Sequence, residues 1–321
     1  MSGKKIAAFA VRLVIAGILL ASILHAVDPL KIKQDLGRLQ IDRLALLIVI
    51  SWIGQLFCAQ RWRLFAFSQG MPDSYSTFFQ IYFLGMLFNV GLPSLVGGDT
   101  IKAYLISRRT GKALHNGLAS VLQDRAVGLI SLLIYGSAAV LWVPLIWRGL
   151  PLWVLYGLAW VGIALFLFLI WRGDFVYRRY LIPGSRSLLQ RGLALLASFH
   201  DSLTHVRVPA GSWSQIVAIS FFNSGLVLWT LQQVSVAAGN PVDLAGFSAL
   251  FPLIAVVTML PISLGGLGIR EWAYVEGLAL LKVPADIALT IALATSALMV
   301  VADLVGIFFL PLLPAESRAK M

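Results

Sequence analysis

The chain of 321 residues is 59% hydrophobic and only 12% charged, and its mean hydropathy is +0.88. A soluble domain carries about twice that charged fraction, so this composition excludes a soluble globular protein and predicts an all-α polytopic membrane protein. The net charge of +11 does not indicate nucleic-acid binding, because Lys and Arg collect in the cytoplasmic loops of membrane proteins.

Six apolar runs are long enough to predict full transmembrane helices. They lie at about 6–26, 43–59, 117–142, 151–171, 213–236 and 286–312. The first run follows the residues MSGKK, and we expect an uncleaved span there because the run is long for the apolar part of a signal peptide. Two further apolar stretches, at about 77–105 and 245–281, are each interrupted by proline and glycine.

The loop at 172–213 is the only sizeable soluble segment that we expect between the spans. Six apolar residues recur in it at helical spacing, which predicts a helix lying on the cytoplasmic membrane surface. They are Leu189, Leu193, Leu196, Phe199, Leu203 and Val206. We interpret this helix as a packing element and assign it no substrate role.

The two interrupted stretches contain nearly the same twelve residues. PSLVGGDTIKAY at 93–104 is the first motif, and PISLGGLGIREW at 261–272 is the second. They align without a gap, so the proline, the paired glycines, an isoleucine, a cation and an aromatic residue coincide. The aligned cations are Lys102 and Arg270.

Proline lacks an amide hydrogen and clashes with the preceding turn, so we expect helices to end before Pro93 and Pro261. Paired glycines then let the backbone reverse or approach a ligand closely. The helices should restart near Asp99 and Thr100, which are good N-cap residues, and near Gly268 in the second motif.

Charge counting favours re-entrant segments at both motifs. If the N-terminus is cytoplasmic and each interrupted stretch returns to its own side, 15 basic residues lie inside and six outside. The two motifs then enter from opposite sides, as in the inverted repeats of transporters. We expect one integral membrane domain over 1–321, with repeat halves at about 43–142 and 213–312. The alternative is that both motifs are kinks that only help helices to pack.

Seven ionisable residues lie at the expected membrane depth, where charged side chains are costly and call for a functional hypothesis. They are Asp99, Lys102, Asp124, Arg125, Arg270, Glu271 and Asp303. Structural interpretations also exist: Asp124 pairs with a nearby cation, Arg125 snorkels from the end of a span, and Asp303 hydrogen-bonds to a broken helix.

The aligned cations Lys102 and Arg270 indicate an anion ligand. A restarted helix presents free amide hydrogens and the positive end of its dipole. Arginine adds a planar fork that suits phosphate, and lysine adds a point charge. We therefore expect two headgroup cradles, offered from opposite sides of the membrane. Glu271 would temper the charge of Arg270 or carry a proton.

Sequence signatures of catalysis are missing. The chain has no Walker A motif, no G-x-S-x-G and no H-E-x-x-H. The single cysteine, Cys58, and four histidines without metal-ligand spacing argue against a metal site. We therefore expect no enzyme, no metal and no cofactor, although a membrane transferase that uses Asp99 or Glu271 as a base stays open.

A family resemblance emerges from three segments. GLPSLVGGDTIKAYLISRRTG, ASVLQDRAVGL and LPISLGGLGIREWA resemble the lysylphosphatidylglycerol synthase transmembrane region, or flippase-like domain family, over about residues 10–312. The positions that match its motifs are Gly97, Gly98, Asp99, Lys102, Asp124, Arg125, Gly265, Gly266, Gly268, Arg270 and Glu271. Lys102 departs from the arginine that the family pattern leads us to expect.

The resemblance implies a multi-pass protein of the cell inner membrane that is linked to lipid translocation. About nine residues follow the last predicted span, so we do not expect the soluble aminoacyl-transfer domain of the full synthase. We expect a flippase or transporter for an anionic phospholipid or a polyisoprenyl-phosphate lipid, with both termini cytoplasmic. The alternatives are an accessory subunit that partners a lipid-synthesis enzyme, and the membrane transferase.

Overall fold

The computed structural model describes residues 36–91, 97–180, 200–204, 208–259 and 268–312, together with residues 31, 34, 197 and 198. The expected span at 6–26 lies outside these residues. So do Pro93, Pro261, Gly265 and Gly266 of the two motifs, and most of the expected surface helix. The described residues 200–204 of that helix are helical.

The prediction of an all-α protein is confirmed, apart from one small hairpin. Among the described elements, the first helices are α3 (Ile41–Ser68), α4 (Tyr75–Gly91), α5 (Gly97–Thr110) and α6 (Leu114–Ala139). Strands β1 (Ile146–Trp147) and β2 (Leu150–Pro151) pair antiparallel. The remaining elements are α7 (Leu152–Tyr180), α9 (Ala210–Ala237), α10 (Leu244–Met259), α11 (Ile269–Ala279), α12 (Ala285–Asp303) and the 3-10 helix η1 (Leu304–Leu312).

Within the described residues, four helices are long and apolar enough to cross a membrane. They are α3, α6, α9 and the continuous segment Ala285–Pro311, which joins α12 to η1. Shorter apolar helices occupy Leu152–Phe168 and Leu244–Met259. These helices agree with a membrane-embedded, multi-pass protein.

The element order repeats along the chain. A long helix, two short helices and a long helix occur as α3 to α6 and again as α9 to η1. Both α3 and α9 have 28 residues, α4 and α10 have 17 and 16, and α5 and α11 have 14 and 11. The second set starts 169 to 172 residues after the first, because the start pairs are 41 and 210, 75 and 244, 97 and 269, and 114 and 285.

The turns repeat as well. A residue with positive φ follows α3, α5, α9 and α11, and these residues are Gly70, Gly111, Gly239 and Lys282. The amide of the next residue donates a hydrogen bond five residues back, as in Met71 to Ala66 and Asn240 to Ser235. This is the Schellman arrangement, which ends a helix by satisfying its last carbonyls.

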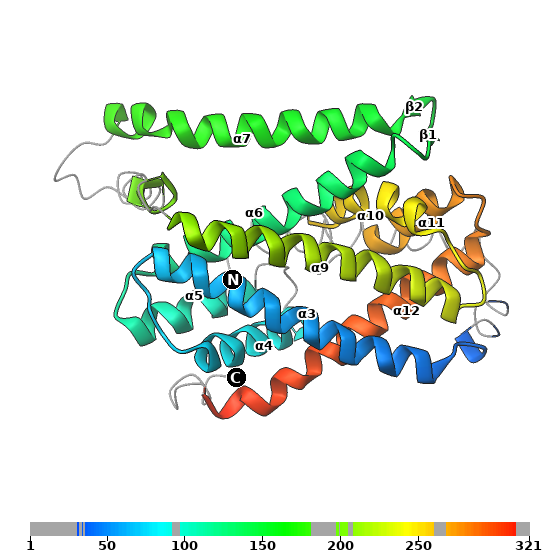
Figure 1. Ribbon diagram of the computed structural model, residues 1–321, viewed down its shortest axis with the longest axis horizontal. Coiled ribbons are helices and arrows are strands. Elements are labelled where there is room, and N and C mark those ends of the chain that lie inside the picture. The colour runs from blue at the N-terminus through cyan, green and yellow to red at the C-terminus, as the bar shows by residue number, and fades with distance from the viewer. Residues whose placement is uncertain are drawn as a thin grey trace, which may run out of the picture.

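The two pairs of short helices lie at opposite ends of the long ones (Figure 1). The chain enters α4 and leaves α5 at one end, and it enters α10 and leaves α11 at the other. The pairing across the halves is crossed, because α6 packs against α10 and η1 packs against α4. Helices α3 and α9 pack against each other between them.

The apolar core has two main parts. One contains Trp62, Phe78 and Ile106 from α3, α4 and α5. The other contains Phe247, Tyr274 and Ile291 from α10, α11 and α12. Each pair of short helices is therefore held by its own cluster at one end of the bundle.

The start of α5 corrects one sequence expectation. The helix begins at Gly97 rather than near Asp99, so Asp99 lies within its first turn and is not an N-cap. The side-chain oxygen of Asn89 on α4 accepts a hydrogen bond from the Gly98 amide at 3.1 Å. A Cβ on Gly98 would lie 1.9 Å from the carbonyl oxygen of Gly85, so glycine is required there by the close approach of α4 and α5.

The second restart agrees with the prediction. Gly268, with φ of 80°, is the N-cap residue of α11, and the helix begins at Ile269. A positive φ favours glycine because this residue has no Cβ to clash with the backbone.

Candidate functional site

Three predicted site residues meet where α5 packs on α6. The Nζ of Lys102 lies 2.8 Å from Oδ1 of Asp99, one turn earlier in α5. From α6, Arg125 donates from Nε to Oδ2 of Asp99 at 2.9 Å and from Nη2 to Oδ1 at 3.1 Å. This two-point contact is the planar fork geometry in which arginine binds carboxylates and phosphates. We call Asp99, Lys102 and Arg125 the triad.

The two cations of the triad differ in accessibility. The side chain of Lys102 is 3% exposed, and its Nζ lies 4.5 Å from the ring centroid of Tyr82 and 5.6 Å from that of Trp62. The side chain of Arg125 is 43% exposed. Two cations share one carboxylate, so the triad carries a net positive charge. Its accessible part is Arg125, not Lys102, which our sequence interpretation had treated as the anion ligand.

Asp124 on α6 is the remaining ionisable residue predicted in this half, and it pairs with α3 rather than with the triad. Its Oδ1 accepts a hydrogen bond from Nε of Arg61 on α3 at 2.6 Å, and both side chains are buried. Arg61 also donates from Nη1 to Oγ of Ser220 on α9 at 3.0 Å. This confirms the structural interpretation of Asp124 as the partner of a cation.

The position of Arg61 corrects the charge count. The 15 basic residues counted as cytoplasmic include Arg61, which follows the predicted span 43–59, but α3 continues to Ser68 and buries it. The apolar residues on both sides of it, in CAQRWRLFAF, were the available signal that the helix continues.

The second half places Gly268, Arg270 and Glu271 at the start of α11. The buried Glu271 accepts a hydrogen bond from the Gly268 amide at 2.7 Å, so its carboxylate closes the first turn of the helix. Arg270 donates from Nη1 to Oγ of Ser296 on α12 at 3.2 Å.

The polar contacts of the two halves occupy matching positions. Arg125 and Ser296 each lie 11 residues after the first residue of their helices, α6 and α12. Asp99 of α5 therefore contacts α6 at the same helix position at which Arg270 of α11 contacts α12. Lys102 and Arg270 align in sequence but make different contacts.

Asp303 links the two halves. It is the last residue of α12 and lies within electrostatic range of both Arg125 and Arg270. Seven residues separate it from Ser296, so the two side chains lie on one face of the helix, about two turns apart. Among the residues that the structure describes, none donates a hydrogen bond to its carboxylate. The charges of two arginines from different halves therefore act on one carboxylate that has no hydrogen-bonded partner among the described residues.

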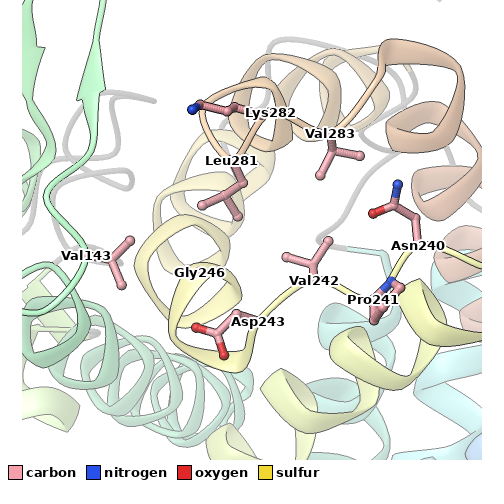
Figure 2. Close-up of a pocket in the computed structure, with 9 residues that line it drawn as sticks. All are labelled: Val143, Asn240, Pro241, Val242, Asp243, Gly246, Leu281, Lys282 and Val283. Carbon is pink, nitrogen blue, oxygen red and sulfur yellow. The ribbon is translucent and has the colours of Figure 1, made fainter.

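A separate cavity of about 220 Å³ lies at the end of the bundle where α10 begins. Figure 2 shows Asp243 and Lys282 at opposite edges of this cavity, with Leu281 near Gly246 and Val283 on the side of the loop residues Asn240 and Val242. Its polar groups do not converge, which distinguishes it from the site around Arg125. In the described part of the chain, no group of three or more His, Cys, Asp or Glu side chains is placed to hold a metal ion.

The sequence was compared with known families and proteins. The family model for the lysylphosphatidylglycerol synthase TM region matches residues 9–306. A UPF0104 membrane protein of Methanothermobacter thermautotrophicus (strain Delta H) is 21% identical over 281 residues, which cover 81% of this chain and 81% of the relative. No solved structure matches the chain.

Proposed function

Because the chain belongs to the lysylphosphatidylglycerol synthase transmembrane-region family, we propose that it moves an anionic lipid between the leaflets of the cell inner membrane. The lipid class is a phospholipid or polyisoprenyl-phosphate lipid whose phosphate is the recognised group. In this proposal both termini are cytoplasmic, and the chain acts as a transporter rather than as an enzyme.

The arrangement of Arg125, Arg270 and Asp303 carries this proposal. Arg125 keeps donors beyond the two that it directs at Asp99, and Arg270 keeps donors beyond the one that it directs at Ser296. A lipid phosphate that enters between them takes the place of the Asp303 carboxylate as their counter-ion. Lys102 then acts as a positioning residue, because its charge holds Asp99 in the orientation that receives Arg125.

The repeated element order supports an alternating mechanism. We interpret α4–α5 and α10–α11 as re-entrant pairs that dip from opposite leaflets, with the phosphate site between the halves. Arg125 belongs to the first half and Arg270 to the second, so each half contributes one ligand. A shift of one half against the other then exposes the site to one leaflet at a time.

The chain carries no nucleotide-binding motif, so the movement runs down a lipid gradient or uses an ion gradient. If protons are coupled, a carboxylate that gives up its counter-ions to the lipid phosphate is the natural carrier, and the half-buried Asp303 is the candidate. Collapse of the proton gradient in proteoliposomes separates the two modes, because downhill exchange continues without it.

The direct test is transfer of fluorescent phosphatidylglycerol and phosphatidylethanolamine across proteoliposome membranes, measured by quenching of the outer leaflet and normalised to folded protein. Arg125→Gln and Arg270→Gln should each lower apparent affinity for the anionic lipid about ten- to a hundred-fold, because a charge-assisted contact is worth about 1.5–3 kcal/mol. Arg109→Gln is the matched control, since Arg109 also pairs with an aspartate, Asp73 at 2.6 Å, but at an exposed site on the bundle end.

Equal losses in all three variants would contradict an anion site at Arg125 and Arg270. Wild-type protein that is inactive alone but copurifies with a lipid-synthesis enzyme would favour the accessory-subunit alternative. Chemical turnover of the lipid in detergent would favour the transferase.

A further inference from the structure

A second cavity, of about 320 Å³, lies between the start of α3 and the last turns of α9. It is lined by Asp42, Arg43, Leu46, Leu47, Trp229 and Gln233. Arg43 and Arg61 are 18 residues apart on α3, which corresponds to about 27 Å along the helix. The cavity is therefore distinct from the site around Arg125.

The polar end of this cavity presents both signs of charge. Asp42 is exposed in the first turn of α3, and Arg43 beside it is half-buried. Arg43 donates from Nη1 to Oε1 of Gln233 at 3.3 Å, which fixes the guanidinium against α9 and leaves its other donors for a ligand. Trp229, about two turns before the end of α9, lines the cavity with its indole ring.

An exposed apolar face runs from the cavity along α3. Leu46 (57% exposed), Val49 (47%), Ile53 (43%) and Phe57 (43%) follow one another at helical spacing. At its far end, the ring of Phe57 meets that of Phe222 on α9 edge-on, with centroids 5.1 Å apart. The 11 helical steps from Leu46 to Phe57 span about 16 Å, close to the depth of one leaflet, which is half of the roughly 30 Å hydrocarbon core.

We propose that this cavity and face, the α3–α9 groove, bind one zwitterionic phospholipid as a resident lipid. Its phosphate contacts Arg43, its ammonium contacts Asp42, and one acyl chain lies along Leu46 to Phe57. A purely anionic headgroup is disfavoured, because the Asp42 carboxylate would repel it. A purely apolar occupant would leave both charges without a ligand. The groove is independent of the proposed transport function, since it shares no residue with the site around Arg125.

The test is native mass spectrometry of protein incubated with phosphatidylethanolamine or phosphatidylglycerol of identical acyl chains. Wild-type protein should retain one phosphatidylethanolamine. Arg43→Gln, chosen because glutamine can still bond to Gln233, should lower that affinity about ten-fold. Asp42→Asn should remove the preference, so that phosphatidylglycerol binds as well. Arg148→Gln is the control, because its side chain is 67% exposed at the far edge of the same bundle end.

A second measurement keeps the proposal testable if a variant folds poorly. Cysteine placed at position 53 in a Cys58→Ala background should crosslink to a phospholipid that carries a thiol-reactive acyl chain. Retention that is unaffected by both Arg43→Gln and Asp42→Asn would overturn the proposal. Disulfide formation between position 53 and a second cysteine introduced into segment 6–26, with no labelling by the lipid probe, would do the same, since the groove would then hold part of the protein.

Discussion

Replacement of Arg61 by methionine should destabilise the folded protein more than any exposed arginine substitution. The pair of Arg61 and Asp124 is buried, with 2.6 Å between Nε and Oδ1, and Arg61 adds a 3.0 Å bond to Ser220. Removal of one partner leaves an uncompensated charge in the apolar interior, which costs roughly 3–5 kcal/mol. That loss lowers the unfolding temperature by something on the order of 5–15 °C.

The unfolding temperature can be measured through the chain's own cysteine. Cys58 is the single cysteine and is buried, so a dye that fluoresces on reaction with thiols reports unfolding during a temperature ramp. The double variant Arg61→Met with Asp124→Leu should recover most of the lost stability, because it removes both charges together. Arg109→Gln should shift the transition little, since its pair with Asp73 is exposed. Unfolding of Arg61→Met within 1–2 °C of wild type (about the effect of an exposed pair) would contradict this expectation, as would a double variant no more stable than Arg61→Met alone.

Three further substitutions test packing and charge at the site. Gly98→Ala should abolish the folded yield on size-exclusion chromatography, because its Cβ meets the Gly85 carbonyl, whereas Gly157→Ala, with open space around it, should express normally. Lys102→Arg should lower the unfolding temperature by an amount equivalent to about 1–3 kcal/mol, because the larger head enters the enclosed space beside Tyr82; unchanged stability would contradict that enclosure. Asp303→Asn should raise the affinity for phosphatidylglycerol by several-fold in a thermal-shift titration, and unchanged affinity would refute its role as competing counter-ion.

Much of the helix pattern could be predicted from the sequence because it depends on local properties. Apolar runs located α6, α9 and Ala285–Pro311 within three residues, but α3 continues nine residues beyond the predicted end at 59. The second restart at Gly268 followed from glycine chemistry. The first restart was misplaced because the N-cap preference of Asp99 competes with ion pairing. Its carboxylate binds Lys102 and Arg125, and Asn89 from the preceding helix takes over the contact with the first turn.

The accessibility of the cations could not be predicted because it depends on distant residues. Lys102 and Arg270 occupy equivalent positions in the two motifs, yet Lys102 is enclosed by Tyr82 from α4 and Trp62 from α3. The burial of Arg61 likewise depends on Asp124, which lies 63 residues further along the chain. Pattern and composition do not contain such pairings, which arise only when the helices pack.

The crossed pairing of helices also determines how long a helix waits during synthesis for the helix that packs against it. Leu244, the first residue of α10, comes 105 residues after Ala139, the last residue of its partner α6. At about 5–20 residues per second, α6 waits roughly 5–20 s in the membrane before α10 is synthesised. The partner of α4, η1, begins 213 residues after α4 ends, so α4 waits about twice as long. Insertion must therefore precede assembly, and α3 to α6 remain an open half until α10 and η1 have been synthesised.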